Sequence, residues 1–561
     1  MRAKNLTRFV LLIAIIIASN VAASFVFSRF DMTSDKRYTL SESTRNLLKG
    51  LKDVVHFKIY LSGDFPSGFE KLEKAIHETL DEMRIYAGDN LSYEFIDPSA
   101  LTDETKRREL YKQLSERGIV PTSLEEKHQN KQSSRLIFPG ALIYYGANER
   151  ALMLLKDQTG RSPELMLNNS IQNLEYELVN AIRKITTMKP EKIAFIEGHD
   201  ELPQKNIADI AQSLAGAYDL KRVRIEGKLG SLKGIKTIII AKPMLPIDEK
   251  DKFVIDQFVM NGGSVLWLID GMLAEMDSLS ERNEILAVSN NLNVEDMLFR
   301  YGARVNNDVV QDVVAAPIPV VTGYVGDKPK TSLLPWNYFP ISIPETKHPI
   351  VFNINPVKFQ FASSIDTIGL HGIKKTILLT TSEYSRIQGS PARISLELLR
   401  QKPDLPQFNK KFLTLAVLLE GSFSSLYENR IPPAIAESKE IGFRAKGKPA
   451  RMLVISDGDI IRNDYRKAGN QIMPLGYDRY TGEVYGNKTF LLNAIDYLTD
   501  ESGIIHIRSK ELKLRIFDKP KLENSKANWQ LIVTAGPVLL VLLLGALKNF
   551  NRRRKYASQA A

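Results

Sequence analysis

Two carboxylates directly follow a strongly apolar segment in the stretch RMLVISDGDIIRND, residues 451–464. A buried strand that ends in Asp457 and Asp459 is one way for an α/β protein to present a divalent cation, because hard cations bind carboxylate oxygens. Asp464 adds a third carboxylate nearby. The spacing fits neither an EF-hand loop nor the phosphatase pattern D-x-D-x-[TV], since two isoleucines follow the second aspartate. We therefore favour a turn at a strand end over a metal site.

A second polar group follows the apolar strand KIAFI, residues 192–196, and combines a histidine with carboxylates. Such a group can bind a metal or act as an acid/base pair. Because parallel strands end at one edge of a sheet, both groups are candidates for one crevice there. HExxH and paired-histidine spacings are absent, which favours a solvated loop. The candidate crevice residues are Glu197, His199, Asp457 and Asp459, with Asp200 and Glu201 beside them.

Several kinds of chemistry are excluded by residue type and spacing. The sequence contains no cysteine, which excludes disulfides, thiolate metal ligands and thiol nucleophiles. It also lacks the GxxxxGK[ST] loop, a GxGxxG motif after a strand and the GxSxG elbow. We expect no catalytic residue, no metal and no cofactor. Trp336, Tyr338 and Phe339 lie among prolines, and such aromatic clusters pack a loop more often than they contact a partner or ligand.

Two uncharged segments bracket the chain, at residues 9–27 and 529–547. Nineteen residues reach about 28 Å as a helix, close to the roughly 30 Å thickness of the hydrocarbon core. We predict that both segments span a membrane. The first has a rival interpretation as a cleaved signal peptide, since Val21-Ala22-Ala23 is a possible cleavage site. The second has the lesser alternative of a buried core helix.

The net charge of +11 is concentrated at the two ends of the chain. Eight uncompensated cations lie in residues 1–8 and 548–561, which leaves only about +3 for the remainder, too little for a nucleic-acid-binding surface. By the positive-inside rule both ends are cytoplasmic. Residues 28–528 are then periplasmic, in a bacterial inner-membrane protein.

The elements between the spans predict two α/β domains, joined to the membrane by segments 28–50 and 506–528. Residues 51–188 have the order β-α-β-α-β-β-α, with a polar loop at 121–134, which resembles a thioredoxin-like domain without its redox cysteines. Residues 189–505 alternate apolar strands with helices, which indicates a parallel sheet covered on both faces. A β-rich insertion at about 271–448 interrupts this second domain.

Several segments carry a resemblance that covers nearly the whole chain. NSIQNLEYELVNAIRKIT, IAFIEGHDEL, FASSIDTI, LLEGSFSSLYENR and VISDGDII occur in order between the two spans. In these segments the chain resembles the gliding-motility-associated ABC transporter auxiliary proteins (GldG) of Bacteroidetes. The resemblance implies a substrate-binding-like subunit that partners a multi-span permease and a cytoplasmic ATPase, in the environment of envelope motility and secretion components. The second domain resembles class I glutamine amidotransferases, whose cysteine nucleophile is missing here.

Our hypothesis is therefore a non-enzymatic, membrane-anchored auxiliary subunit of an ABC transporter. Two alternatives remain open. One is a structural scaffold of the motility machinery without a transport role. The other is a periplasmic hydrolase that holds a metal between the strand-end carboxylates.

Overall fold

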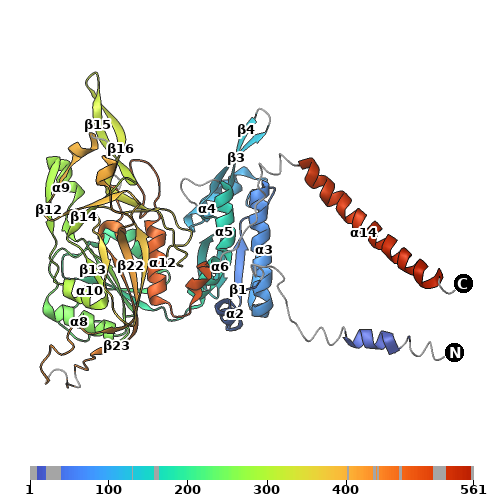
Figure 1. Cartoon of the computed structure of the whole chain (residues 1–561), viewed down its shortest axis with the longest axis horizontal. Helices are drawn as coiled ribbons and strands as arrows, with labels where there is room; N and C mark the ends of the chain where they lie inside the picture. Colours follow the sequence, from blue (N-terminus) through green and yellow to red (C-terminus); the bar gives the residue numbers. More distant parts are fainter. Residues whose placement is uncertain are drawn as a thin grey trace. The chain divides into compact units, whose positions relative to one another are not determined.

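A computed structural model describes residues 9, 11–19, 39–128, 131–156, 163–400, 403–433, 437–438, 441–466, 471–509 and 526–557. The chain divides into one large unit, residues 1–510, and a small one, residues 511–561. The large unit is of the mixed α/β class and contains several sheets. Figure 1 labels its elements along the chain.

The amino-terminal part of the large unit is built on a four-stranded sheet with the order β2-β1-β5-β6. Strands β1 and β2 are parallel, whereas β5 pairs antiparallel with both β1 and β6. Apolar side chains at three- and four-residue spacing fix the helices on the sheet, and Leu72, Ile76, Leu80 and Met83 are fully buried. The elements are α2 (Glu42–Lys49), β1 (Val55–Ile59), α3 (Ser67–Ala87), β2 (Leu91–Phe95), α4 (Glu104–Glu116), β5 (Gly140–Tyr145), β6 (Asn148–Met153), α5 (Pro163–Gln172) and α6 (Leu174–Thr186).

The segment predicted as a polar loop forms a hairpin instead. Strands β3 (Thr122–His128) and β4 (Lys131–Ile137) pair antiparallel, from Thr122 opposite Ile137 to His128 opposite Lys131. The loop prediction was wrong here because most of the side chains are polar and show no period-two alternation. Backbone hydrogen bonds between the strands leave no such signal in the sequence.

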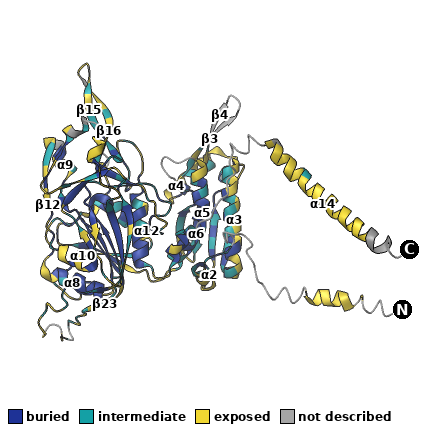
Figure 2. Ribbon diagram, viewed as in Figure 1, coloured by how far each residue is buried: buried dark blue, intermediate teal, exposed yellow. Residues whose placement is uncertain are grey.

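The carboxyl-terminal part of the large unit is built on a seven-stranded sheet with the order β19-β22-β23-β10-β9-β7-β8. Its five strands from β23 to β8 are parallel. The central strands β9 and β10 are buried along their whole length, whereas no residue of the edge strand β8 is buried (Figure 2). The parallel strands are β7 (Lys192–Glu197), β8 (Asp219–Arg224), β9 (Thr237–Ala241), β10 (Ser264–Leu268) and β23 (Lys446–Ile455).

Helices cover both faces of this sheet, as continuous apolar strands predict. One face packs against α7 (Ala208–Ala215) and α12 (Asn487–Thr499) through strand residues such as Phe195. The other packs against α8 (Glu249–Met260) and α10 (Glu295–Tyr301) through strand residues such as Trp267.

The β-rich region contributes to this sheet rather than lying wholly apart from it. Strands β22 (Thr414–Ser424) and β19 (Ile373–Thr380) add to β23 in antiparallel orientation, so the sheet is mixed. Residues 415–419 of β22 are completely buried, which explains their place inside the sheet. The sequence marks these residues as buried but cannot name their partner strand.

The rest of this region packs around a separate aromatic core. Trp336, Tyr338, Phe339 and Phe361 are buried there with ring centroids 4.9–6.3 Å apart. The aromatic cluster therefore packs the interior of this region, which agrees with the packing role that we favoured from the sequence. The elements are β11 (Met272–Leu273), α9 (Met276–Arg282), β12 (Glu284–Ser289), β13 (Ala303–Val305), β14 (Asp308–Asp312), β15 (Ala315–Val325), β16 (Lys328–Ser342), β17 (Val357–Lys358), β18 (Ile365–Thr367), β20 (Ser385–Gly389) and β21 (Ala392–Ser395).

The small unit contains the helix α14 (Lys526–Ala557). Its stretch Asn528–Arg552 has a mean hydropathy of 2.3 over its apolar window and is long enough to cross a membrane. Within the described parts of the chain it is the one helix that meets both criteria. Of the first predicted span, residues 9 and 11–19 are helical and exposed, whereas 10 and 20–27 lie outside the described residues.

Candidate functional site

The carboxyl ends of the parallel strands bring several charged residues to one edge of the large sheet. In the strand order β8-β7-β9-β10-β23, the chain adds β8 on one side of β7 and the later strands on the other side, so the direction changes between β7 and β9. Ligands of such sheets bind beyond the carboxyl ends of the strands at this switch point. Lys242 follows β9, Asp270 follows β10, and Asp457 and Asp459 follow β23. These four residues form one buried group, which we call the lysine cluster.

Lys242 is the centre of the lysine cluster, and only 3% of its surface is exposed. Its Nζ lies 2.5 Å from Asp459 Oδ2 and 3.2 Å from Asp270 Oδ2. The backbone of Lys242 has a φ of 56°, a left-handed conformation that is uncommon away from glycine. A Cβ atom at Gly458 would lie 2.6 Å from the Lys242 Cβ, so only glycine fits opposite this lysine. Strain and close packing at one point indicate a position that the surrounding structure strongly constrains.

Backbone N–H groups satisfy the remaining carboxylate oxygens of the lysine cluster. Asp457 accepts hydrogen bonds from the N–H of Asp459 and the N–H of Gln360, each at 2.7 Å. Asp270 accepts one from the N–H of Gly458 at 2.5 Å. The Asp-Gly-Asp sequence is therefore a strand-end turn, and Asp457 also ties it to the segment that contains Gln360.

Burial sets the protonation of the lysine cluster. It raises the pKa of Asp270 to about 6, and it raises the pKa of Asp457 well above its usual value. Burial alone would lower the pKa of Lys242, but the carboxylates of Asp270 and Asp459 outweigh it and raise that pKa. Lys242 is consequently a fixed cation rather than a nucleophile, since an amine must lose its proton to attack.

The two other predicted crevice residues have different partners. Glu197 forms an ion pair with Arg222 on the neighbouring strand β8. His199 Nδ1 lies 3.2 Å from Glu201 Oε1, and its Nε2 lies 3.3 Å from Asp251 Oδ2. Burial lowers the pKa of His199, but these carboxylates outweigh it and raise that pKa.

The four predicted residues are therefore not joined directly, and their position at one crevice stays a prediction. Among the described residues, no hydrogen bond or ion pair joins Glu197 or His199 to Asp457 or Asp459. In the same parts of the chain, no group of three histidine, aspartate or glutamate side chains is arranged to hold a metal ion.

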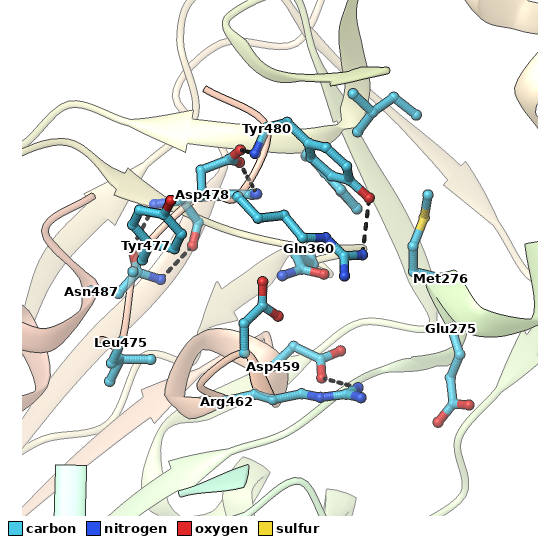
Figure 3. Close-up of a pocket in the computed structure, with 16 residues that line it drawn as sticks. Glu275, Met276, Gln360, Asp459, Arg462, Leu475, Tyr477, Asp478, Tyr480 and Asn487 are labelled. Carbon is cyan, nitrogen blue, oxygen red and sulfur yellow. Dashed lines mark hydrogen bonds and ion pairs between the residues drawn. The ribbon is translucent and has the colours of Figure 1, made fainter. Parts of the chain in front are cut away.

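A cleft of about 130 Å³ opens beside the lysine cluster, and Asp459 belongs to its wall (Figure 3). Lys358 Nζ lies 2.7 Å from the buried Asp478 Oδ2, which joins two segments of the wall. Arg462 Nη1 lies 3.4 Å from Asp459 Oδ1 at the same wall. Further lining residues are Glu275, Gln360, Asp464, Tyr477, Tyr480 and Asn487.

The cleft offers charges of both signs, amides and tyrosine hydroxyls to a small polar ligand. Sequence reasoning identified only Asp457, Asp459 and Asp464 among the residues of the lysine cluster and cleft. Lys242 and Asp270 could have been found by the same rule, because each follows an apolar strand in the sequence. Lys358 and Asp478 carry no such signal, since only the tertiary fold brings them to the strand ends.

Two family models and a curated relative match the sequence of this chain. A family model described as "ABC-type uncharacterized transport system" matches residues 190–494, which is more than half of the chain. A second, described as "Domain of unknown function (DUF7088)", matches residues 34–144. An uncharacterized protein of Borreliella burgdorferi is 22% identical over 545 residues, which cover 95% of each chain.

Solved structures show only distant likeness. The mmIFT52 N-terminal domain has 15% identity and a TM-score of 0.30, covering 55% of this chain and 97% of that one. The exo-β-1,4-mannosidase Op5Man5 from Opitutaceae bacterium strain TAV5 has 12% identity and a TM-score of 0.23, covering 78% of this chain and 49% of that one. TM-scores this low do not establish a shared fold.

Proposed function

The chain belongs to the family described as an ABC-type uncharacterized transport system, and we propose that it is a non-enzymatic, membrane-anchored auxiliary subunit of an ABC transporter. The family match over residues 190–494 is the observation that carries this proposal. Its partners are a multi-span permease and a separate cytoplasmic ATPase.

The proposed location is the bacterial inner membrane. The apolar helix Asn528–Arg552 supports membrane attachment at the carboxyl-terminal end, and the uncharged segment 9–27 supports a second span. The cations in residues 1–8 and 548–561 favour a cytoplasmic position for both ends, with residues 28–528 in the periplasm.

We infer a non-enzymatic role because hydrogen bonds and ion pairs already engage the carboxylates at the strand ends. Both oxygens of Asp457 accept backbone hydrogen bonds, and Asp459 is held by Lys242 and Arg462. These carboxylates hold the turn in place, and none is poised as a general base. The cleft beside them is a place for contact with a ligand or with a partner subunit.

Two finer proposals concern fold and biological setting. The sheet order β2-β1-β5-β6 supports a thioredoxin-like scaffold, and the parallel strands support an amidotransferase-like domain with a β-rich insertion. The segments that resemble the gliding-motility-associated proteins of Bacteroidetes support a role beside envelope motility and secretion components.

Co-purification of the full chain tests the transporter proposal. The tagged chain is extracted from native membranes in mild detergent, and its stoichiometric partners are identified. We expect a multi-span permease and a nucleotide-binding ATPase. A chain truncated after residue 525 is the matched control, and we expect it to lose the permease if α14 docks there.

Two outcomes contradict the proposal and favour its rivals. Recovery of envelope motility components without any permease indicates a scaffold. A stoichiometric divalent ion in the purified chain that is lost on substitution of both Asp457 and Asp459 by Asn indicates the hydrolase alternative.

A further inference from the structure

The β-rich region contains a groove that is separate from the lysine cluster. Two adjoining cavities of about 490 and 170 Å³ share the residues Gln311, Tyr338 and Arg386. We call them together the insertion groove. Gln311 lies on β14, Tyr338 on β16 and Arg386 on β20, so three strands build it.

Arg386 is a half-buried cation without an acidic partner. Its Nε and Nη2 donate to Gln311 Oε1 at 3.0 and 2.8 Å, and its Nη1 donates to Gln407 Oε1 at 2.6 Å. Its guanidinium also lies 4.8 Å from the centre of the Phe408 ring. Among the described residues no carboxylate forms an ion pair with Arg386. Neutral amides thus orient the guanidinium without cancelling its charge.

Trp336 forms part of the wall of the smaller cavity. The side chain is 2% exposed, and its Nε1–H has no hydrogen-bond partner. Because that nitrogen is itself fully buried, a ligand in the cavity would contact the indole ring rather than its N–H. The indole N–H of Trp267 is also unpartnered, but that residue lies in the sheet core and lines neither cavity.

The other charged groups at the insertion groove do not neutralise Arg386. Glu397 and Asp404 line the larger and the smaller cavity, respectively, and both are exposed to water, which screens their charge. Asp404 accepts a hydrogen bond from Gln407 Nε2 at 3.0 Å, so the amide of Gln407 lies between this carboxylate and Arg386. Arg393 lines the larger cavity and is already paired with Glu284 at 2.6 Å. The inner wall therefore presents one positive charge that no carboxylate of the described residues pairs with directly.

We propose that the insertion groove binds a small carboxylate ligand, with Arg386 as its charged partner and the indole ring of Trp336 in the adjoining wall. Guanidinium groups match carboxylates in geometry as well as charge. This site is independent of the transporter proposal and of the cleft at the strand ends.

Titration of the full chain in detergent micelles tests the site. The probes are acetate, succinate and citrate at constant ionic strength, followed by calorimetry and by tryptophan fluorescence. We expect at least one probe to bind saturably and to change the emission of Trp336. Dissociation constants above about 10 mM for all three probes would overturn the proposal.

Matched variants identify the residues responsible. We expect Arg386→Ala to weaken binding by about tenfold or more, since it removes charge-assisted hydrogen bonds. Trp336→Phe keeps an aromatic ring in the wall and should leave the affinity within about twofold of the wild-type value while abolishing the fluorescence change. Arg462→Ala, in the strand-end cleft, should leave the affinity unchanged.

Three results would count against the site. Unchanged affinity in Arg386→Ala would overturn it, and so would a loss of binding in Arg462→Ala alone. Inorganic phosphate that binds as tightly as the carboxylates would show a general anion site instead. Should Trp336→Phe fail to fold, Gln407→Ala at the exposed end of the groove replaces it, with a severalfold weakening expected.

Discussion

Lys242 holds two buried carboxylates at the carboxyl edge of the large sheet, and its removal would leave Asp270 without a counter-ion and Asp459 with Arg462 alone. Asp270 and Asp459 both lie within 3.2 Å of its Nζ, and none of the three side chains is more than 8% exposed. Burying charged groups is costly, and only good geometry and complete hydrogen bonding offset that cost. The lysine cluster therefore specifies how the ends of β9, β10 and β23 meet.

Substitution of Lys242 by Met tests this role. We expect the free energy of unfolding to fall by about 3–5 kcal/mol, because one partner of a buried ionic group is removed. Urea denaturation of the full chain, followed by tryptophan fluorescence, measures the change. The control is Lys74→Met, whose exposed pair with Glu78 should contribute less than about 1 kcal/mol. Equal losses in the two variants would contradict the role of the lysine cluster.

The raised pKa of Asp270 predicts a dependence of stability on pH. Its folded-state pKa of about 6 lies above the ordinary value of 3.8, so its stabilising contribution is full below about pH 4 and declines as pH rises through 6. Asp270→Asn removes this titration. The melting temperature of the variant minus that of the wild-type chain should therefore increase from pH 5 to pH 8. A difference that stays constant over this range would contradict the raised pKa.

At the scale of elements, α6 joins the small sheet to the large one through a buried ionic network. Lys184 Nζ on α6 lies 3.0 Å from Asp496 Oδ2 on α12, and Tyr218 donates to the same carboxylate at 2.5 Å. Arg508 follows on the 3₁₀ helix Ile504–Ser509 and donates to the carbonyls of Pro349 and Phe352 at 3.1 Å each. The network and the apolar core around it connect elements that are more than 300 residues apart in sequence.

Asp496→Ala tests this connection. We expect a loss of about 3 kcal/mol in the free energy of unfolding, because Lys184 keeps its charge in a largely buried place. Cleavage after Glu191 by a glutamate-specific endopeptidase should become faster in the same variant, since this exposed residue lies between α6 and β7. Asp496→Asn keeps the shape of the side chain and so distinguishes the effect of packing from that of charge. If Asp496→Ala is as resistant to this protease as the wild-type chain, the network does not hold the two sheets together.

At the scale of the whole molecule, charge and hydropathy at the two ends determine the proposed membrane topology. The 25-residue stretch Asn528–Arg552 precedes a basic tail, and the segment 9–27 follows three cations. Cations are retained on the cytoplasmic side, which predicts an even number of spans with both ends inside. In this proposed topology residues 28–528 lie on the opposite side of the membrane from both ends.

Two reporter fusions test that topology. Alkaline phosphatase inserted after Gly326, in the turn between β15 and β16, should be active because it is exported. Green fluorescent protein fused after residue 561 should be fluorescent because it remains in the cytoplasm. Replacing the four cations at 552–555 by glutamate should reduce the fluorescence, since the retention signal is lost. An inactive phosphatase together with a dark carboxyl-terminal fusion would reverse the orientation.

The sequence by itself determined the properties that depend on local pattern. The stripe of Leu72, Ile76, Leu80 and Met83 predicted α3, and continuous apolar runs predicted strands buried on both faces. The apolar stretch of α14 was equally recognisable in the sequence, because length and hydropathy are sufficient to predict a membrane-spanning helix. The aspartates after β23 were recognisable for the same local reason.

Only the tertiary structure decided which distant residues meet. Lys242 and Asp270 join Asp457 and Asp459 because the three strands β9, β10 and β23 end side by side, whereas Glu197 and His199 have partners on β8 and α8. The pairing of β22 with β23 and the hairpin β3–β4 rest on backbone hydrogen bonds that any side chain permits. Strand pairing and long-range charge contacts depend on the path of the whole chain, and the spacing of residues within a short segment does not predict that path.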